Sequence, residues 1–154
     1  MTIQKTFNYQ KEIEQIKTQF NFDFVALALV QSTNQLFELK WTYATGNHSN
    51  RFRRIVLRTG KGVAGNVLKT GKPMLVEDMA PSLMKNDLHN YLLIVGEGLK
   101  SVGAIPLYKS NRVHGILLVA CREGRKLTAT QFTQLKQAIG PEFGPFYNKE
   151  MFRL

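Results

Sequence analysis

The glycine-rich stretch Gly60-Lys61-Gly62-Val63-Ala64-Gly65 has the spacing G-x-G-x-x-G, typical of loops that bring backbone N–H groups close to an anion. Gly60 and Gly62 allow the backbone to adopt positive φ and to approach a ligand closely. The residues from Val63 onward are expected in the first turn of a helix that ends near Gly71, so their N–H groups lack intrahelical acceptors. A helix start of this kind carries the equivalent of roughly +0.5 charge and readily holds an anion. The alternative is a plain strand-turn-helix with solvated N–H groups.

Two well-known uses of a glycine loop do not fit this sequence. A dinucleotide site needs its loop inside a βαβ unit of a parallel sheet, whereas the long apolar segments here are expected to pair as antiparallel hairpins. A phosphate-binding loop requires Lys-Ser or Lys-Thr after the last glycine, and Asn66-Val67 follow Gly65. A small anionic ligand at the helix start and a plain strand-turn-helix therefore both remain open from these residues.

Covalent and metal chemistry receive little support from the residue types. Cys121 is the only cysteine, which excludes an intramolecular disulfide and a two-cysteine redox cycle within the chain. Because it ends an apolar strand, we expect a buried structural thiol. His48, His89 and His114 are far apart and lack metal-ligand spacing. We predict no catalytic residue, no metal and no cofactor.

The N-terminal part of the chain predicts a helix followed by a β-hairpin. Asn8 is a suitable N-cap, and apolar residues then recur on one helical stripe: Tyr9, Ile13, Ile16 and Phe20. The apolar run Phe22–Val30 and the alternating run Phe37–Tyr43 are expected as strands, joined by a turn at Gln31–Gln35.

Trp41 is the aromatic residue of this hairpin with the greatest chemical interest. Strict alternation would place it on one buried face with Phe37, Leu39 and Tyr43. There its ring could form a flat wall of a binding site, or its indole N–H could donate a hydrogen bond. An ordinary core tryptophan is the alternative interpretation.

The rest of the chain predicts further strands and a closing helix. Thr128 and Gln131 have the spacing of a capping box, so a helix or helix pair should begin there and bend or end at Pro141. The expected strands are Phe52–Leu57, which is weaker, Met74–Glu77, and the hairpin of Val102–Tyr108 with Val113–Cys121. No linker or repeat divides the chain, and the order of elements indicates an α+β fold.

Three groups of residues resemble the signature of GAF domains. The glycine loop is followed by Lys69-Thr70-Gly71-Lys72-Pro73 and then by Val76-Glu77-Asp78, which is similar to the family pattern G-x-G-x-x-G, x-T-G-x-P and V-x-D. The segments Ala104–Leu107 and Gly115–Leu117 resemble the two central strands of that family. The signature region covers 58–119, and the flanking helices and first hairpin fit the same fold.

The resemblance implies a single GAF domain over residues 1–154, with a central antiparallel sheet, terminal helices on one side and a ligand pocket on the other. The segment Tyr91–Val95 would be a lid over the pocket, with the Tyr91 hydroxyl inside, although a short buried strand is an alternative. The resemblance implies these ligand-binding residues: Trp41, Gly62, Val63, Ala64, Gly65, Tyr91, Ile94 and Val95. Arg58 could act as a counter-charge, or it could belong to a solvated basic strand face with Arg51, Arg53 and Arg54.

GAF domains are mostly sensory modules rather than enzymes, so the resemblance implies a protein that is not an enzyme. The chain is similar to stand-alone GAF proteins that bind nitrate. This resemblance implies a cytoplasmic sensor that regulates an oxygen-sensing histidine kinase and its response regulator, a two-component system that controls nitrate assimilation. Nitrate would be the ligand. The net charge of +10 independently favours an anionic ligand or partner.

Other functions remain open from the sequence. The terminal helices could dimerise or dock a partner, which would make the protein an adaptor with another ligand or none. Free methionine sulfoxide reduction is disfavoured because Cys121 stands alone. Nucleic-acid binding is not expected, because no recognition motif accompanies the scattered basic residues. No apolar stretch has the length of a signal peptide or a membrane span.

Overall fold

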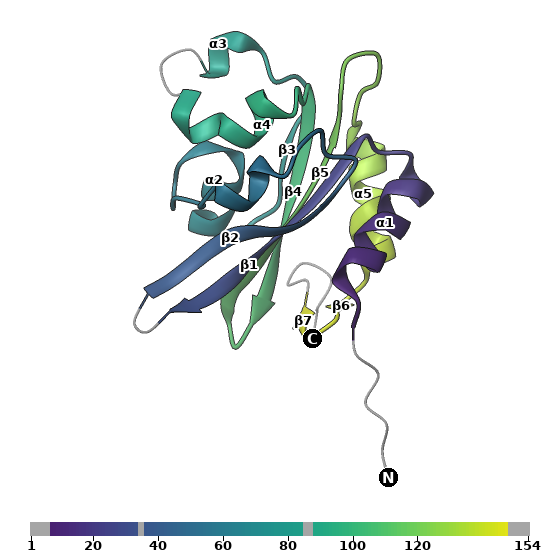
Figure 1. The fold of residues 1–154 in the computed structure, drawn as a ribbon. Helices are drawn as coiled ribbons and strands as arrows, with labels where there is room; N and C mark the ends of the chain where they lie inside the picture. The colour runs from purple at the N-terminus through teal and green to yellow at the C-terminus, as the bar shows by residue number, and fades with distance from the viewer. Residues whose placement is uncertain (1–6, 34–35, 85–87, 148–154) are drawn as a thin grey trace.

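The structure, a computed structural model, describes residues 7–33, 36–84 and 88–147 (Figure 1). Short helices of the 3-10 type are labelled η. The elements in chain order are α1 (Tyr9–Phe20), β1 (Phe24–Thr33), β2 (Leu36–Thr45), η1 (Arg51–Arg54), α2 (Gly62–Thr70), β3 (Met74–Val76), α3 (Pro81–Met84), η2 (Leu88–Tyr91), α4 (Leu92–Gly96), β4 (Ser101–Lys109), β5 (Arg112–Cys121), α5 (Ala129–Ile139), β6 (Glu142–Phe143) and β7 (Phe146–Tyr147).

The strands form one antiparallel sheet in the order β2-β1-β5-β4-β7-β6, with β3 also paired to β4. The two predicted hairpins therefore lie side by side, joined through β1 and β5. On the far side of β4, pairing with β3 stops at Ala104 and pairing with β7 begins at Tyr108. Pro106 lies between these two positions, where its missing N–H interrupts no described pairing on that side.

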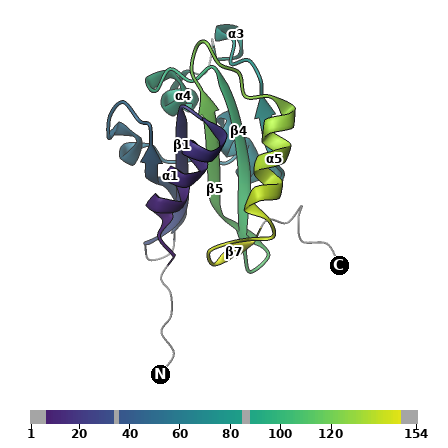
Figure 2. The same cartoon turned by 90° about the vertical axis from the view of Figure 1, so that its right-hand side faces the viewer.

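The sheet separates two layers of helices (Figures 1 and 2). Helices α1 and α5 cover one face, and α2 and α4 cover the other. Ile13 of α1 and Leu135 of α5 are fully buried in the core beneath the terminal helices. Part of the apolar stripe predicted to serve either a core or a dimer is thus used by the core. The expected α+β architecture, with terminal helices on one side of an antiparallel sheet, is confirmed.

The ends of the terminal helices follow the sequence signals. The Asn8 side chain accepts a hydrogen bond from the Lys11 N–H at 3.0 Å. Thr128 and Gln131 form the predicted capping box, with both reciprocal bonds at 3.2 Å. These side chains satisfy N–H groups that the helix cannot pair internally. Helix α5 then ends at Gly140, and the short strands β6 and β7 follow in place of a second helix.

The predicted strand Phe52–Leu57 is wrong. Its first half is the 3-10 helix η1, in which Phe52 is buried and the three arginines are exposed. Because this segment is helical, the Phe52 side chain can enter the core while the arginines stay in solvent and form no strand at the sheet edge. Only an isolated bridge from Val56 to Lys40 and a bond from the Leu57 N–H to the Leu39 carbonyl remain of the strand.

Two further boundaries differ from the sequence prediction. The predicted turn at Gln31–Gln35 is too long, because the strand continues to Thr33 and residues 34–35 lie outside the described part. The stretch Ala80–Lys100, which has few regular sequence signals, contains the short helices α3, η2 and α4. Apolar runs of four or five residues cannot distinguish a short helix from a strand by periodicity.

Candidate functional site

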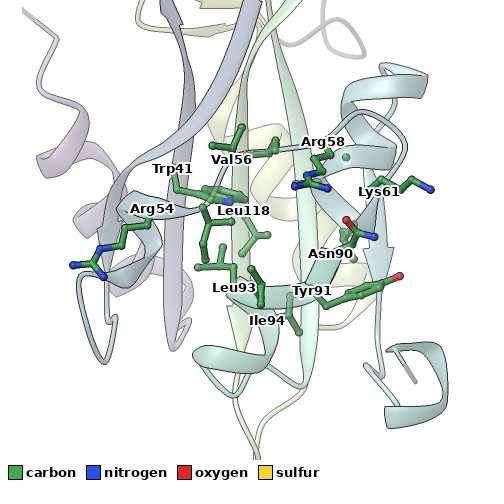
Figure 3. A pocket seen from close by; sticks show the side chains of 16 residues that line it. Trp41, Arg54, Val56, Arg58, Lys61, Asn90, Tyr91, Leu93, Ile94 and Leu118 are labelled. Atoms are coloured by element: carbon green, nitrogen blue, oxygen red, sulfur yellow. The ribbon is translucent and has the colours of Figure 1, made fainter. Parts of the chain in front are cut away.

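A cavity of about 220 Å³ lies on the face of the sheet opposite the terminal helices (Figure 3). We call the segment 88–96, which contains η2 and α4, the lid. Trp41 and Leu118 from the sheet form one side of the cavity, and the lid forms another. The remaining lining residues come from the segment 54–58 and from the start of α2: Arg54, Ile55, Val56, Leu57, Arg58, Lys61, Val63, Ala64 and Gly65.

The glycine loop is shaped by contacts that a side chain would disturb. Gly62 has φ of +71°, and a Cβ at this position would collide with the carbonyl oxygen of Asn90 in the lid. A Cβ at Gly65 would collide with the carbonyl oxygen of Arg58. The Gly60 N–H also donates to the Gly65 carbonyl at 2.7 Å. The glycines thus permit positive φ, as expected, and allow the lid to lie directly against the start of α2.

The predicted helix after the loop is confirmed as α2, which begins at Gly62 and is capped by Gly71 in the left-handed conformation. The N–H groups of its first four residues have no acceptor within the helix. Val63, Ala64 and Gly65 line the cavity, whereas Gly62 is buried at its edge and is not a lining residue. The positive end of the α2 dipole therefore lies beside the cavity.

Trp41 enters the cavity because of an irregularity in β2. The pairing of β1 with β2 shifts between Leu27 and Ala28, so that Leu27 pairs with Tyr43 and Ala28 with Trp41. The extra residue in β2 places Trp41 on the cavity side, where it is 4% exposed, and Tyr43 on the opposite side. The prediction that Trp41 and Tyr43 share a face is therefore wrong. The side chain of Phe37 lies outside the described residues.

The lid is helical, so the alternative of a short buried strand is wrong. Leu93 and Ile94 are buried and line the cavity, while Val95 is 50% exposed and is not among the lining residues. Tyr91 also lines the cavity, but Figure 3 shows its hydroxyl directed away from Trp41. The segment predicted as a lid thus lies over the cavity. The ligand contacts of its residues stay predictions.

The cavity carries positive charge without a balancing carboxylate among its described lining residues. Arg54, Arg58 and Lys61 line it, and the ion pairs found in the described part of the chain involve none of them. In Figure 3 the guanidinium of Arg54 extends away from Trp41, and Arg58 lies on the same side of the cavity as Asn90. Sequence reasoning missed Arg54 and Lys61 as lining residues, because Arg54 was expected on a solvated basic strand face.

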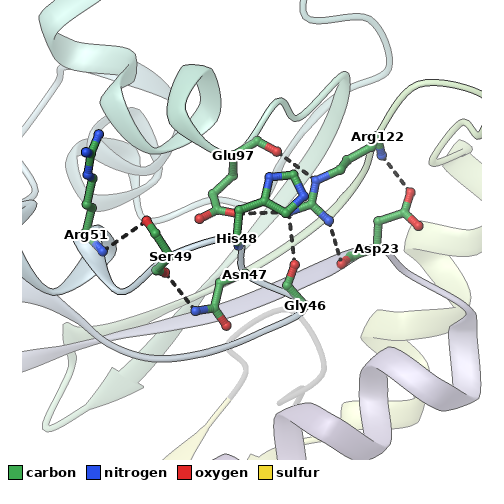
Figure 4. Close-up of polar contacts among 8 residues, drawn as sticks. All are labelled: Asp23, Gly46, Asn47, His48, Ser49, Arg51, Glu97 and Arg122. Atoms are coloured by element: carbon green, nitrogen blue, oxygen red, sulfur yellow. Dashed lines mark hydrogen bonds and ion pairs between the residues drawn. The ribbon is translucent and has the colours of Figure 1, made fainter.

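A partly buried ionic network joins Glu97, which directly follows the lid, to the end of the sheet (Figure 4). Arg122, directly after β5, pairs with the Glu97 carboxylate at 2.8 Å and donates to the Glu97 carbonyl at 2.7 Å. Its other donors reach the carbonyls of Gly46 and Asp23 at 2.9 and 3.2 Å. The Glu97 side chain, only 5% exposed, also accepts the backbone N–H of His48 at 2.7 Å. No sequence motif indicated this network.

The described residues offer little for covalent or metal chemistry. Cys121 is 3% exposed, and burial, followed by the Asp23 charge, raises the pKa of its thiol. A raised pKa disfavours the thiolate that a nucleophilic cysteine needs.

Within residues 7–33, 36–84 and 88–147, no three His, Cys, Asp or Glu side chains are grouped as metal ligands. In the same part of the chain, every helix is too short or too polar to span a bilayer.

Comparison with known proteins identifies the family of the chain. The family model described as GAF domain matches residues 11–140. The chain belongs to the GAF domain family. A search of the curated proteins finds no match.

The structure is also similar to solved structures of NreA from Staphylococcus aureus, mutated in its nitrate binding site. One is 38% identical, with a TM-score of 0.70 over 78% of this chain and 87% of that chain. Another is 34% identical, with a TM-score of 0.71 over 83% of this chain and 97% of that chain.

A more distant neighbour shares the fold alone. The type II free methionine-R-sulfoxide reductase from Thermoplasma acidophilum is 12% identical, with a TM-score of 0.62 over 84% of this chain and 82% of that chain.

Proposed function

We propose that this protein is a nitrate sensor that binds the anion in the cavity between Trp41, the start of α2 and the lid. The observation that carries this proposal is the combination of a helix N-terminus and three cationic side chains around a cavity without a described carboxylate. The similarity to NreA, a protein with a nitrate binding site, supports it.

Nitrate makes specific demands that the lining residues meet. The ion is planar, keeps its charge at physiological pH and accepts hydrogen bonds without donating any. We infer that the backbone N–H groups of Val63 and Ala64 donate to it, since they lack helical acceptors. Trp41, Leu93 and Ile94 would form apolar walls that disfavour larger and more strongly hydrated anions. Gly65, Tyr91 and the edge residue Gly62 would shape the site, and Val95 would support the lid from outside.

We further propose that occupancy of this site is reported to a partner. The partner that we infer from the family resemblance is a cytoplasmic histidine kinase with its response regulator. The lid would carry the signal, because it lines the cavity on one side and reaches solvent on the other. No catalytic residue, metal or cofactor takes part in this function.

Calorimetry with nitrate is the direct test. Chloride, sulfate, nitrite and iodide at constant ionic strength serve as controls, and thermal unfolding is followed in parallel. A single specific site should stabilise the fold by about 2.7 kcal/mol when free nitrate is at 100 times its dissociation constant. Saturable heat with nitrate and little with sulfate is the expected result. Equal heats for all anions, or none, would overturn the proposal.

Two variants locate the site within the protein. Trp41→Phe keeps a buried ring but removes the indole N–H, and we expect nitrate affinity to fall by about tenfold if that group donates to the anion. Arg58→Gln removes a lining charge, and Arg53→Gln is its matched control because Arg53 does not line the cavity. The affinity for nitrate should fall more in Arg58→Gln than in Arg53→Gln. The remaining nitrate binding of Arg58→Gln should also depend less on salt. Equal effects of the two arginine variants would place the anion elsewhere.

A further inference from the structure

The outer face of the lid presents apolar side chains to solvent beside the cavity. Leu92 is 54% exposed and Val95 50% exposed, and their spacing of three residues places them on one side of α4. Val56, 36% exposed, lines the same cavity. Among the described residues the only other large apolar side chain with such exposure is Met74. Two of these four exposed side chains, Val56 and Leu92, line the cavity, and a third, Val95, lies in the lid beside Leu92. Exposed apolar side chains that group in this way mark an interaction surface.

Exposed arginines lie alongside this apolar group. The segment 46–54 runs beside the lid, because the His48 N–H bonds to the Glu97 carboxylate just after α4, and Arg54 shares the cavity lining with Leu92. Arg51, Arg53 and Arg54 are all exposed in η1. We define the mouth surface by these residues: Arg51, Arg53, Arg54, Val56, Leu92 and Val95. It joins an apolar centre to a basic flank.

We propose that the mouth surface binds an acidic, amphipathic segment of a partner protein. Carboxylates of the partner pair with the arginines of η1, and its apolar side chains cover Leu92 and Val95. The ion pairs formed within the described part of the chain leave these arginines available. Charge complementarity of this kind steers association and fixes the orientation of the partner.

The charge also argues against the other candidates for this surface. A second copy of this chain, docked through the same patch, would oppose arginines to arginines. The net charge of +10 adds to that repulsion. A nucleic acid would pair its phosphates with the arginines, but it would leave the apolar centre without a matching surface.

The mouth surface shares residues with the cavity, which couples partner binding to the ligand. Leu92, Arg54 and Val56 line the cavity and also belong to the mouth surface. A ligand that shifts them changes the affinity for the partner, and the partner changes the affinity for the ligand by the same factor. This coupling rests on the proposed nitrate function, whereas binding of the acidic segment does not.

The test uses a designed helical peptide with a leucine stripe flanked by glutamates, titrated into the full chain by fluorescence anisotropy. Two control peptides are matched to it: in one the glutamates are replaced by lysine, and in the other the leucines are replaced by serine. We expect the acidic amphipathic peptide to bind at least about tenfold more tightly than either control, and more weakly as salt increases. Leu92→Ser/Val95→Ser and Arg51→Gln/Arg53→Gln should each weaken binding by about tenfold.

Control variants distinguish binding at this surface from nonspecific binding. Met74→Ser removes an exposed apolar side chain of β3 outside the mouth surface, and Lys11→Gln removes an exposed charge of α1. Neither should change peptide binding. Thermal unfolding of each variant establishes that it folds. If a double variant does not fold, the single variants Val95→Ser and Arg53→Gln replace it in the binding measurement.

Specific outcomes would overturn the proposal. The absence of peptide binding would overturn it. So would a loss of peptide affinity in Met74→Ser as large as the loss in Leu92→Ser/Val95→Ser. So would a concentration-dependent dimer that is lost in Leu92→Ser/Val95→Ser, or a DNA oligonucleotide that binds more tightly than the peptide and ignores that variant. If nitrate fails to bind in calorimetry while the peptide still binds, the nitrate function fails and the docking surface stands.

Discussion

Cys121 shows how burial determines the chemistry of a single side chain. It lies at the end of β5, pairs across to Ser101 in β4 and is almost completely buried. Burial raises the pKa of its thiol, and the nearby Asp23 charge acts in the same direction. The neutral thiol is therefore a packing group, as its place at the end of an apolar strand predicted.

The same shift predicts a stability change at alkaline pH. The folded-state pKa of Cys121 lies above its ordinary value of 9.0, so its stabilising effect is complete below that value. The effect is lost as the pH rises through the folded-state pKa. The free energy of unfolding should therefore decrease above about pH 9, and the raised pKa values of Tyr9 and Tyr108 add to the decrease at higher pH.

Urea unfolding of the protein and of Cys121→Ala between pH 7 and pH 10 measures this effect. The variant loses packing at every pH, so only the pH dependence of the difference is informative. The stability advantage of the unmodified protein should shrink as the pH rises. If the difference in free energy of unfolding between the two proteins stays constant across this range, the pKa of the Cys121 thiol is not raised by folding.

Individual residues were predictable where a local rule fixes them. Asn8, Thr128 and Gln131 satisfy helix N–H groups in ways that depend on a few neighbouring residues. Arg54 and Lys61 were missed as lining residues, because their positions depend on how distant elements pack. Arg122 was missed for the same reason: its acceptors include Asp23, which is 99 positions away.

At the scale of elements, the contact between the glycine loop and the lid is the most constrained feature of the site. Gly62 and Gly98 both have positive φ, +71° and +66°. A Cβ at Gly62 would strike the Asn90 carbonyl, whereas a Cβ at Gly98 would meet nothing within 4 Å. The pair therefore separates the cost of backbone conformation from the cost of displacing the lid.

We expect Gly98→Ala to lower the free energy of unfolding by about 1–2 kcal/mol, the cost of a left-handed non-glycine residue. Gly62→Ala should cost more and should also weaken nitrate binding, since the lid must move from the start of α2. Urea unfolding and calorimetry of both variants provide the measurements. Equal losses of stability, with equal nitrate affinities, would show that the lid does not depend on this contact.

The second constraint on the lid is the ion pair between Arg122 and Glu97. Arg122→Met removes the partner of a carboxylate that is only 5% exposed, and we expect a loss of about 3 kcal/mol. Arg125→Met is the matched control, because Arg125 is 46% exposed and lies 3.4 Å from Asp23. That change should cost about 1 kcal/mol or less. Comparable losses in urea unfolding would argue that Arg122 does not hold the lid.

Elements were predictable in proportion to their length and regularity. The long strands β1, β2, β4 and β5 and the terminal helices have apolar patterns that specify them. The lid and η1 do not, because each contains only a few residues and takes its shape from what it covers. The register shift in β2 also escaped prediction, since one extra residue in a strand leaves no mark on its composition.

At the scale of the whole molecule, the sheet divides the interior into two apolar cores. Residues 24–28 of β1 are fully buried, with side chains alternating between the core of the cavity side and the core of the terminal helices. Both faces of this strand are covered, which explains its continuous apolar sequence. Close-packed cores of this kind are stiff and transmit strain, and a polar side chain at the end of the sheet can form a second bridge between its two sides.

Arg122 provides such a bridge around the end of the sheet. It bonds to Glu97 at the end of the lid and to the carbonyl of Asp23, which lies in the connection between α1 and β1. A change in the lid can therefore reach the start of β1 without passing through the apolar cores. We expect the effect of a ligand to spread along this path and to leave α5 unchanged.

Hydrogen exchange measured by mass spectrometry tests this path. Saturating nitrate should slow amide exchange at the start of α2, in the lid and at Asn21–Asp23, whereas Ala129–Ile139 should exchange as before. Sulfate at equal ionic strength is the control. In Arg122→Met, protection of the lid should persist while protection at Asn21–Asp23 disappears. Protection that also extends over α5, or that survives this substitution at Asn21–Asp23, would mean that the two sides of the sheet communicate through the packed core.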